Sequence, residues 1–265
     1  MQLAQAAVRL APIEVVDAIG HVGRLLRLQD HRAIHDGVHG ARPDVKEVSR
    51  LDGHEILELV PAALLDHLGK LGHTVYPGAD DNASGVAALL SLARMFSAMK
   101  ADGKGPRKNL IFVAFDGKEL DMFGSRRFVR NLDIPHSKIT AMVNMDMLGT
   151  DLVPPRRNRE YLFAIGENSL PESYRGYLSY ICTRARYKMD LDLTFYGSRN
   201  FWKMMYETSD QHPFARAGIP AVLFTSAFHQ HTLKKTDTPA IIDYQLLRKR
   251  TLVIYNFILR LCAEN

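Results

Sequence analysis

The apolar residues of this chain follow two periodic patterns. Short runs that are almost entirely apolar indicate buried strands, and they occupy residues 109–115, 138–148, 160–166 and 219–226. Apolar residues that recur every three or four positions predict helices, and these stretches are residues 82–99, 120–129, 172–186 and 244–262. Because strands alternate with helices, we expect an α/β fold: a three-layer sandwich in which helices cover both faces of a mostly parallel, mixed central sheet.

The segments between these elements predict one domain. Two loops rich in glycine, proline and charge, 100–109 and 149–158, are typical of surface connections rather than domain linkers. We therefore expect residues 1–265 to form a single domain, in which residues 1–55 show no clear strand pattern. That N-terminal part holds a polar cluster that suits an exposed loop or, alternatively, a second metal site. The cluster comprises His31, His35, Asp36 and His39.

Composition limits the class of protein. A chain of 265 residues, 46% of them hydrophobic, can bury a large core. It has no apolar run of about 18 residues, so we expect no membrane span and no signal peptide within the chain. The net charge of +5 is spread over short basic groups, which indicates solvated faces rather than a nucleic-acid partner. Cys182 and Cys262 are the only cysteines, too few for a disulfide scaffold or a cysteine-built zinc site.

Acidic and imidazole side chains follow the apolar runs. Ligands of α/β proteins gather beyond the carboxyl ends of the strands, so these positions are candidates for a functional site. They are Asp80, Asp81, Asp116, Lys118, Glu119, Asp146, His229, His231 and Asp237. Converging carboxylates repel one another, and a divalent cation relieves that repulsion. A mixed set of carboxylates and imidazoles favours zinc over calcium or magnesium.

Each of these residues also has an ordinary structural interpretation. Asp80 or Asp81 alone suits a helix N-cap or a turn. Glu119 alone suits the first turn of a helix, where the helix dipole favours a negative charge. His229 and His231 alone suit a polar loop. Their joint appearance after separate apolar runs is what favours a shared site.

Five blocks of the sequence carry a resemblance. They are PGADDNASGVAALLSLAR (77–94), FVAFDGKELDMFGSRRFV (112–129), VNMDMLG (143–149), TSDQHPFARAGIPAVLF (208–224) and HTLKKTDT (231–238). The set resembles the zinc exopeptidase superfamily of bacterial aminopeptidases, glutamate carboxypeptidase and glutaminyl cyclase. The resemblance implies a peptide or amino-acid derivative as ligand. It also implies an extracytoplasmic location, since members of that superfamily are often exported.

The resemblance implies roles for particular residues. In that superfamily the second Asp of the first block bridges two metals, which corresponds to Asp81, and its peptide bond to the next residue, here Asn82, is commonly cis. The second block supplies a catalytic Glu followed by a metal-binding Glu, which corresponds to Glu119. Asp146 corresponds to a ligand of the other metal, and Asp210 to a supporting acid near the site.

The chain departs from the superfamily pattern at a histidine ligand. The segment LLDHLG has Leu64 where that histidine belongs. An isobutyl group cannot coordinate zinc, so we expect the second metal position to be weak or empty, and Asp66 loses the imidazole that it would orient. His67 is a possible substitute ligand, but as a strand residue its side chain would project to the opposite face.

A second departure concerns the general base. Lys118 stands where the superfamily has the glutamate that accepts a proton from metal-bound water. Neighbouring carboxylates raise the pKa of a lysine, so we expect a charged ammonium group. Lys118 is then expected to pair with Asp81 or Asp146 and to replace part of the missing metal charge.

The last histidine of the pattern is ambiguous. An ungapped match backward from Asp237 leads to Leu233, whereas two extra loop residues lead to His231. Because loops tolerate insertions, we favour His231. Asp81, Glu119 and His231 would then form a three-ligand zinc site with an open fourth position, and we expect at most one zinc ion per chain.

Three functions follow from this pattern. The first is a zinc aminopeptidase-like protein with a degenerate site that is weakly active or inactive. The second is a glutaminyl cyclase-like acyl transferase with a single zinc ion, although that chemistry also uses the glutamate absent here. The third is a non-catalytic protein that binds a peptide or a glycan in a residual polar pocket.

Overall fold

The computed structural model describes residues 6–9, 58–65, 67–151, 158–194 and 197–263. Within the first of these ranges only the backbone is described. Asp66 and the N-terminal cluster of His31, His35, Asp36 and His39 lie outside the described residues. All other candidate residues named above lie within them.

A seven-stranded sheet forms the centre of the molecule, with the strand order β1-β5-β2-β6-β9-β7-β8. The strands β5, β2, β6 and β9 run parallel to one another, whereas β1 pairs antiparallel with β5 and β7 pairs antiparallel with β9. The mostly parallel, mixed sheet predicted from the sequence is therefore confirmed. The strands are β1 (Ala6–Arg9), β2 (Glu58–Leu64), β5 (Asn109–Phe115), β6 (Ile139–Met145), β7 (Tyr161–Ile165), β8 (Asp190–Asp192) and β9 (Ala221–Thr225).

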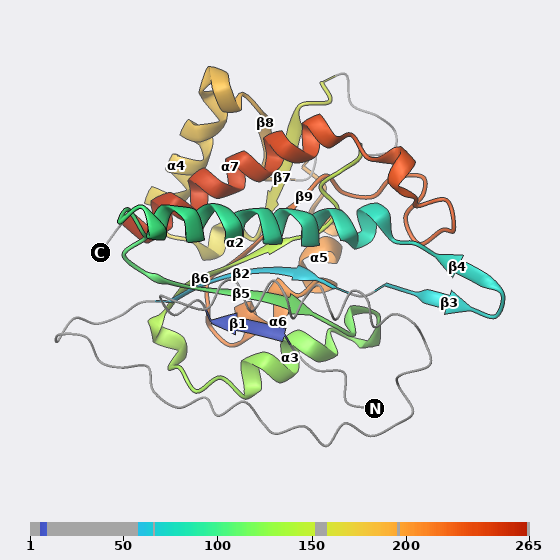
Figure 1. Ribbon diagram of the computed structural model, residues 1–265, viewed down its shortest axis with the longest axis horizontal. Coiled ribbons are helices and arrows are strands. Elements are labelled where there is room, and N and C mark those ends of the chain that lie inside the picture. Colours follow the sequence, from blue (N-terminus) through green and yellow to red (C-terminus); the bar gives the residue numbers. More distant parts are fainter. Residues whose placement is uncertain (1–5, 10–57, 66, 152–157, 195–196, 264–265) are drawn as a thin grey trace.

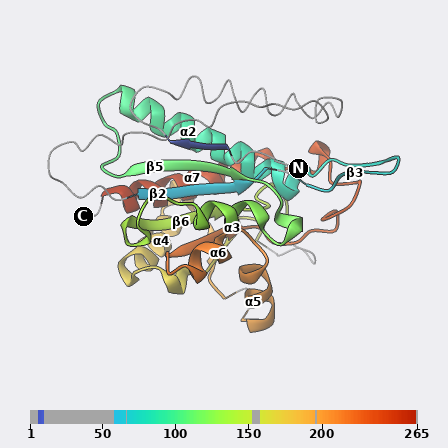
Figure 2. The same cartoon turned by 90° about the horizontal axis from the view of Figure 1, so that it is seen from below.

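Helices cover both faces of this sheet, as expected. The helices α2, α4 and α7 pack on one face, and α3 and α6 pack on the other. Figure 2 shows α5 projecting from the side of the molecule opposite α2. The helices are α2 (Gly85–Ala101), α3 (Phe123–Arg130), α4 (Glu172–Thr183), α5 (Arg199–Glu207), α6 (Gln211–Arg216) and α7 (Tyr244–Ala263).

Alternate residues of each central strand face different helical layers. Leu110, Phe112 and Ala114 of β5 join the core under α2, α4 and α7, whereas Ile111 and Val113 join the core under α3 and α6. Both faces of the strand are therefore apolar, as expected for a parallel sheet between two helical layers. This explains why the sequence shows an uninterrupted apolar run at β5 rather than an alternating one.

The structure contains elements that the apolar pattern did not predict. The strand β2 lies at the centre of the sheet although Pro61 stands in its middle, a residue that normally argues against a central strand because it lacks an N–H donor. A two-stranded hairpin of β3 (Gly69–Leu71) and β4 (Thr74–Tyr76) extends away from the body of the molecule (Figure 1). The helices α5 and α6 were also not predicted.

The described part of the chain has no helix that is long and apolar enough to cross a membrane. Cys182 and Cys262 are both free and buried in the core beneath α4 and α7. Burial raises the pKa of each thiol to about 12. The two cysteines therefore contribute apolar packing rather than a crosslink.

The core beneath α7 predicts the effect of a truncation. Phe257 is fully buried, and its ring centroid lies 5.6 Å from that of Phe224 on β9. We expect Phe257→Ala to lower the free energy of unfolding by about 3–5 kcal/mol, because it leaves a cavity between α7 and the sheet. Tyr244→Ala is the matched control, since Tyr244 begins the same helix and is 63% exposed. Urea titration of both variants measures the difference, and equal losses would contradict this account of the core.

Candidate functional site

The candidate residues gather at one edge of the sheet. The parallel strands β2, β5, β6 and β9 end at this edge, at Leu64, Phe115, Met145 and Thr225. Lys118 and Glu119 follow β5, Asp146 follows β6, and the loop after β9 carries His229. Parallel strands thus bring together acids and bases from distant parts of the chain, as the sequence predicted.

The turn before α2 supplies Asp81. It spans Ala79–Ser84, where Asp81 and Asn82 leave helical geometry and the peptide bond between them is cis, as the resemblance implied. The Asn82 side chain donates to the carbonyl oxygen of Met145 at 2.9 Å and accepts from the backbone N–H of Met147 at 3.0 Å. These bonds fix the turn to the end of β6, beside Asp146. A Cβ atom on Gly85 would lie 2.4 Å from Asn82 Oδ1, so only glycine fits there.

Asp237 holds the same turn from the opposite side. Its carboxylate accepts the backbone N–H of Asp80 at 2.9 Å and that of Asp81 at 3.0 Å. Asp237 is fully buried, so its two oxygens are satisfied by backbone donors rather than by water. The sequence analysis included Asp237 among the candidate site residues and used it to align the loop, and the structure makes it a positioning residue for Asp81.

Asp80 is a structural neighbour of the candidate ligand, as expected. It is fully buried and accepts hydrogen bonds from the backbone of Gly149, at 2.6 Å, and from the hydroxyl of Thr150. His229 Nε2 lies 3.4 Å from Asp80 Oδ2, and His229 Nδ1 accepts the backbone N–H of His231. Burial lowers the pKa of His229, against the opposing effect of Asp80. His229 therefore serves as a neutral link between this loop and Asp80.

Lys118 occupies the space between two buried carboxylates. Its Nζ atom lies 2.6 Å from Asp146 Oδ2 and 3.7 Å from Asp81 Oδ1. Burial alone would lower the pKa of Lys118, but the carboxylates of Asp146 and Asp81 outweigh it and raise this pKa above its usual value. The side chain is thus an ammonium ion, as the sequence analysis expected, and cannot accept a proton.

Asp81 has the opposite electrostatic environment. Burial raises its pKa to about 7, although the nearby ammonium of Lys118 acts in the other direction, and the charges of Asp146 and Glu119 raise it further. Asp81 Oδ1 has no hydrogen-bond partner among the described residues. Its negative charge therefore depends on a nearby cation.

Polar side chains behind the carboxylates orient them. Ser209 donates to Asp146 Oδ2 at 3.0 Å and itself accepts a hydrogen bond from Asn144 at 3.0 Å. Asp210, the predicted supporting acid, is fully buried at the start of α6 and accepts from the Ser125 hydroxyl of α3 at 2.6 Å. Its charge contributes to the raised pKa of Lys118. Asp210 therefore adds to the negative field around Lys118.

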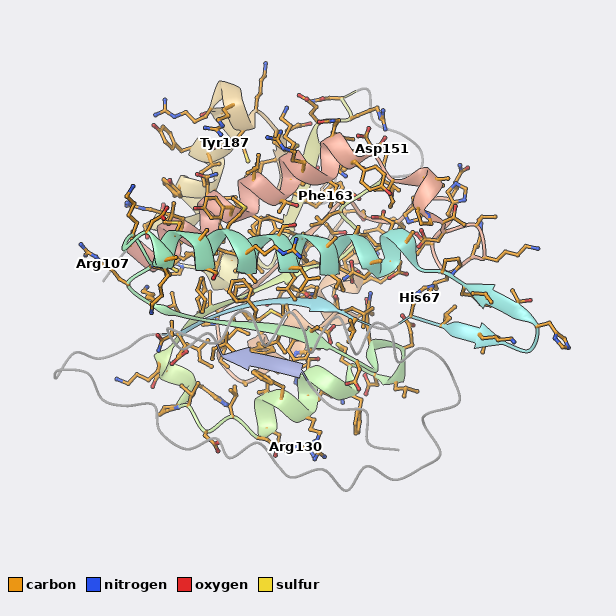
Figure 3. The ribbon with its side chains drawn as sticks, viewed as in Figure 1. His67, Arg107, Arg130, Asp151, Phe163 and Tyr187 are labelled. Atoms are coloured by element: carbon orange, nitrogen blue, oxygen red, sulfur yellow. The ribbon has the colours of Figure 1, made fainter. Side chains whose placement is uncertain are left out.

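His67 lies closer to the candidate site than the sequence suggested. Strand β2 ends at Leu64, so strand alternation does not apply to His67. Its Nδ1 atom lies 3.9 Å from Asp81 Oδ2, at the base of the β3–β4 hairpin (Figure 3). A Cβ atom on Gly78 would lie 2.8 Å from the His67 ring, and Gly78 also has a positive φ of 61°, so glycine is needed there. The expected projection to the opposite face is therefore wrong.

A cavity of about 140 Å³ opens onto these groups. Asp81, Lys118, Glu119 and Asp146 line it, and the remaining wall is largely apolar or hydroxylic. That wall comprises Met147, Met205, Thr208, Ser209, Phe228, Thr232 and Leu233. His231 is not part of this lining; its ring bonds with Thr236 at 2.9 Å and Gln230 at 3.1 Å. The structure thus brings together four candidate residues and leaves His231 to one side.

These side chains do not fit a zinc ion as they are arranged. No three His, Cys, Asp or Glu side chains in the ranges that the structure describes lie close enough together to hold a metal. Leu64 is 1% exposed at the end of β2 and supplies no donor atom. The ligand set of Asp81, Glu119, Asp146 and His231 therefore stays a prediction.

Sequence reasoning missed the guanidinium of Arg250. This side chain is fully buried, and its Nη1 group donates to the carbonyl oxygens of Leu148 at 2.7 Å and Thr150 at 2.8 Å. Its Nε–H group donates to the backbone carbonyl oxygen of Tyr161 at 3.0 Å. Arg250 thereby fixes the segment whose Thr150 bonds to Asp80. A signal was present, because Arg250 interrupts the apolar stripe of the α7 helix, where a charge must find buried partners.

Comparison with known proteins identifies the family. Residues 50–258 match the model of Peptidase family M28, so the chain belongs to that family of peptidases. A probable glutamate carboxypeptidase of Zea mays is 44% identical over 70 residues, which are 26% of this chain and 10% of that protein. Transferrin receptor protein 2 of Homo sapiens is 38% identical over 78 residues, 28% of this chain and 10% of the receptor. The matched segment is thus only about a tenth of each relative's length.

Solved structures share the fold over a longer stretch. The LapA aminopeptidase of Legionella pneumophila aligns with a TM-score of 0.64 and 18% identity, covering 79% of this chain and 53% of that one. The zinc aminopeptidase of Bacillus subtilis aligns with a TM-score of 0.63 and 17% identity, covering 83% and 49%. The glutaminyl cyclase of Porphyromonas gingivalis aligns with a TM-score of 0.55 and 18% identity, covering 77% and 73%. This chain therefore spans about half the length of the two aminopeptidases.

The Arg250 contacts predict a stability effect. We expect Arg250→Met to lower the free energy of unfolding by about 3 kcal/mol, because several buried carbonyl oxygens lose their donor. Arg248→Met is the control, since Arg248 lies on the same helix and is exposed. Urea titration of both variants measures the difference. An Arg250 variant as stable as the Arg248 variant would show that the guanidinium does not hold this segment.

Proposed function

We propose that this member of Peptidase family M28 has an impaired catalytic site and is weakly active or inactive as an aminopeptidase. In this proposal its cavity binds a peptide or an amino-acid derivative. The observation that carries the proposal is the position of Lys118. The superfamily pattern has a proton-accepting glutamate at this position, whereas here the Lys118 ammonium group contacts Asp146.

The chemistry of Lys118 supports loss of the general base. Peptide hydrolysis needs a group that accepts a proton from the attacking water and delivers it to the leaving amine. An ammonium group held by two carboxylates has no lone pair for this role. Loss of a general base commonly lowers the rate by about 10²–10⁴-fold. Leu64 adds a second defect, because it replaces a histidine donor of the superfamily pattern.

The cavity nevertheless supports ligand binding. It combines charged groups on its floor with methionine, phenylalanine and leucine side chains on its wall. A free amine or an amide of a peptide would find acceptors in Asp81 and Glu119, while an apolar side chain would contact Phe228 and Met205. This mixture of polar and apolar lining suits a peptide terminus better than it suits a polyanion.

Names of relatives do not decide between catalysis and binding. The chain matches over part of its length both a probable glutamate carboxypeptidase and a protein named as a receptor. The glutaminyl cyclase-like alternative meets the same obstacle as peptidase activity, because the glutamate that it needs is also replaced by Lys118. We therefore place impaired catalysis first.

Replacing Lys118 tests the loss of the base. We expect the unmodified protein to hydrolyse amino-acid anilides slowly or not at all with added zinc, and Lys118→Glu to raise the rate by about 10²-fold. Lys70→Glu, an exposed charge reversal on β3, is the control and should leave the rate unchanged. The initial rates of a panel of anilides measure the effect.

The outcomes separate the two defects. If Lys118→Glu brings no gain, the double variant Leu64→His with Lys118→Glu tests whether the missing histidine is limiting. Rapid hydrolysis by the unmodified protein would refute the proposed impairment, whatever the variants do.

A further inference from the structure

Two buried acids face each other in the cavity. Asp81 is 3% exposed and Asp146 is 1% exposed. The Asn82 hydrogen bonds described above tie the turn that carries Asp81 to the backbone on either side of Asp146. A cation beside the two acids stabilises their charged forms, because two buried carboxylates without one repel each other and one of them tends to take up a proton.

Lys118 supplies a cation from within the chain. We propose that its ammonium group is the built-in cation of the Asp81–Asp146 pair, so that the pair is stable without a metal ion and a divalent cation can enter only by displacing Lys118. The proposal rests on the proposed function, because it takes the same cavity to be the functional site. It concerns the charge and the stability of that site rather than a reaction rate.

The backbone around Lys118 directs its side chain into the site. Gly117 has a positive φ of 66°, and the short 3-10 turn of Lys118–Leu120 follows directly. Glycine adopts this conformation without strain, so the chain can turn sharply after β5. The turn leaves Glu119 exposed at the cavity, whereas the Lys118 side chain is 13% exposed and reaches Asp146.

A metal ion would compete for the same space. Zinc binds a carboxylate oxygen at about 2.0–2.2 Å, and the Lys118 nitrogen lies 2.6 Å from Asp146 Oδ2. A second cation at that oxygen would meet both the bulk and the charge of the ammonium group. The remaining oxygens, Asp81 Oδ1 and Asp146 Oδ1, have no hydrogen-bond partner among the described residues. If Lys118 is removed, a divalent ion therefore finds free lone pairs and uncompensated charge.

Thermal unfolding with and without zinc tests the inference. We expect the melting temperature of the unmodified full chain to be the same in EDTA and in zinc chloride. We expect Lys118→Met, which keeps most of the side-chain volume, to melt roughly 10 °C lower in EDTA, because the carboxylates lose their cation. Zinc should recover at least half of that loss in Lys118→Met. Lys118→Arg, which keeps the charge, should lose less than Lys118→Met.

Lys249→Met is the matched control. Lys249 Nζ also lies 2.6 Å from a carboxylate oxygen, that of Glu160, but this carboxylate is 49% exposed. Water solvates the Glu160 carboxylate when Lys249 is replaced. The melting temperature of Lys249→Met should therefore change by no more than about 1–2 °C and should not respond to zinc. The control also corrects for zinc that binds elsewhere on the surface.

Three results would overturn the inference. These are a fall in the melting temperature of the unmodified protein in EDTA, one zinc ion per purified chain by elemental analysis, or a Lys118→Met variant that behaves like Lys249→Met. The first two need no variant, so they remain decisive if Lys118→Met does not fold. Rapid anilide hydrolysis in EDTA would refute the proposed function alone, whereas a zinc-stabilised but inactive protein would refute this inference alone.

Discussion

Repulsion between buried carboxylates is the constraint on which the candidate site depends. The parallel strands of the sheet end at one edge, and there the chain places Asp81 and Asp146 within reach of a single ammonium group. One protein that shares this fold is named a zinc aminopeptidase. In this chain the ammonium group of Lys118 lies close to both carboxylates. It needs no external ligand, and in the proposed function it also stands in place of the proton acceptor that hydrolysis requires.

Buried hydrogen bonds around Asp81 and Asp146 fix the turn that carries Asp81 and orient the carboxylate of Asp146. Asp237 satisfies two backbone N–H groups of the turn, and Ser209 donates to Asp146. Arg250 contributes indirectly. It donates a hydrogen bond to the carbonyl oxygen of Thr150, whose hydroxyl bonds to Asp80. Leu64 and Lys118 depart from the superfamily pattern, whereas this supporting hydrogen-bond network is present. That contrast favours a retained function for the cavity, such as ligand binding.

Much of the fold could be predicted because it depends on local patterns. The apolar run at residues 109–115 coincides with β5, and the periodic stretch from Tyr244 marks α7. Strand β2 was not predicted because Pro61 interrupts its apolar run, and its pairing with β5 and β6 shows it to be an inner strand. His67 was misplaced for a related reason, since strand geometry was applied to a residue beyond the end of β2.

The sequence by itself determined the chemical identity of the site and the family of the chain. It supplied the acids, a lysine where the resemblance expects the base, and a leucine where the resemblance expects a ligand. Tertiary structure alone decided which of these groups meet. It joined Lys118 to Asp146, placed His67 beside Asp81, and left His231 outside the cavity lining. The reason is physical. Residue type fixes what a side chain can donate or accept, whereas the distances between separate segments of the chain depend on strand order and on the buried hydrogen bonds that fix each turn.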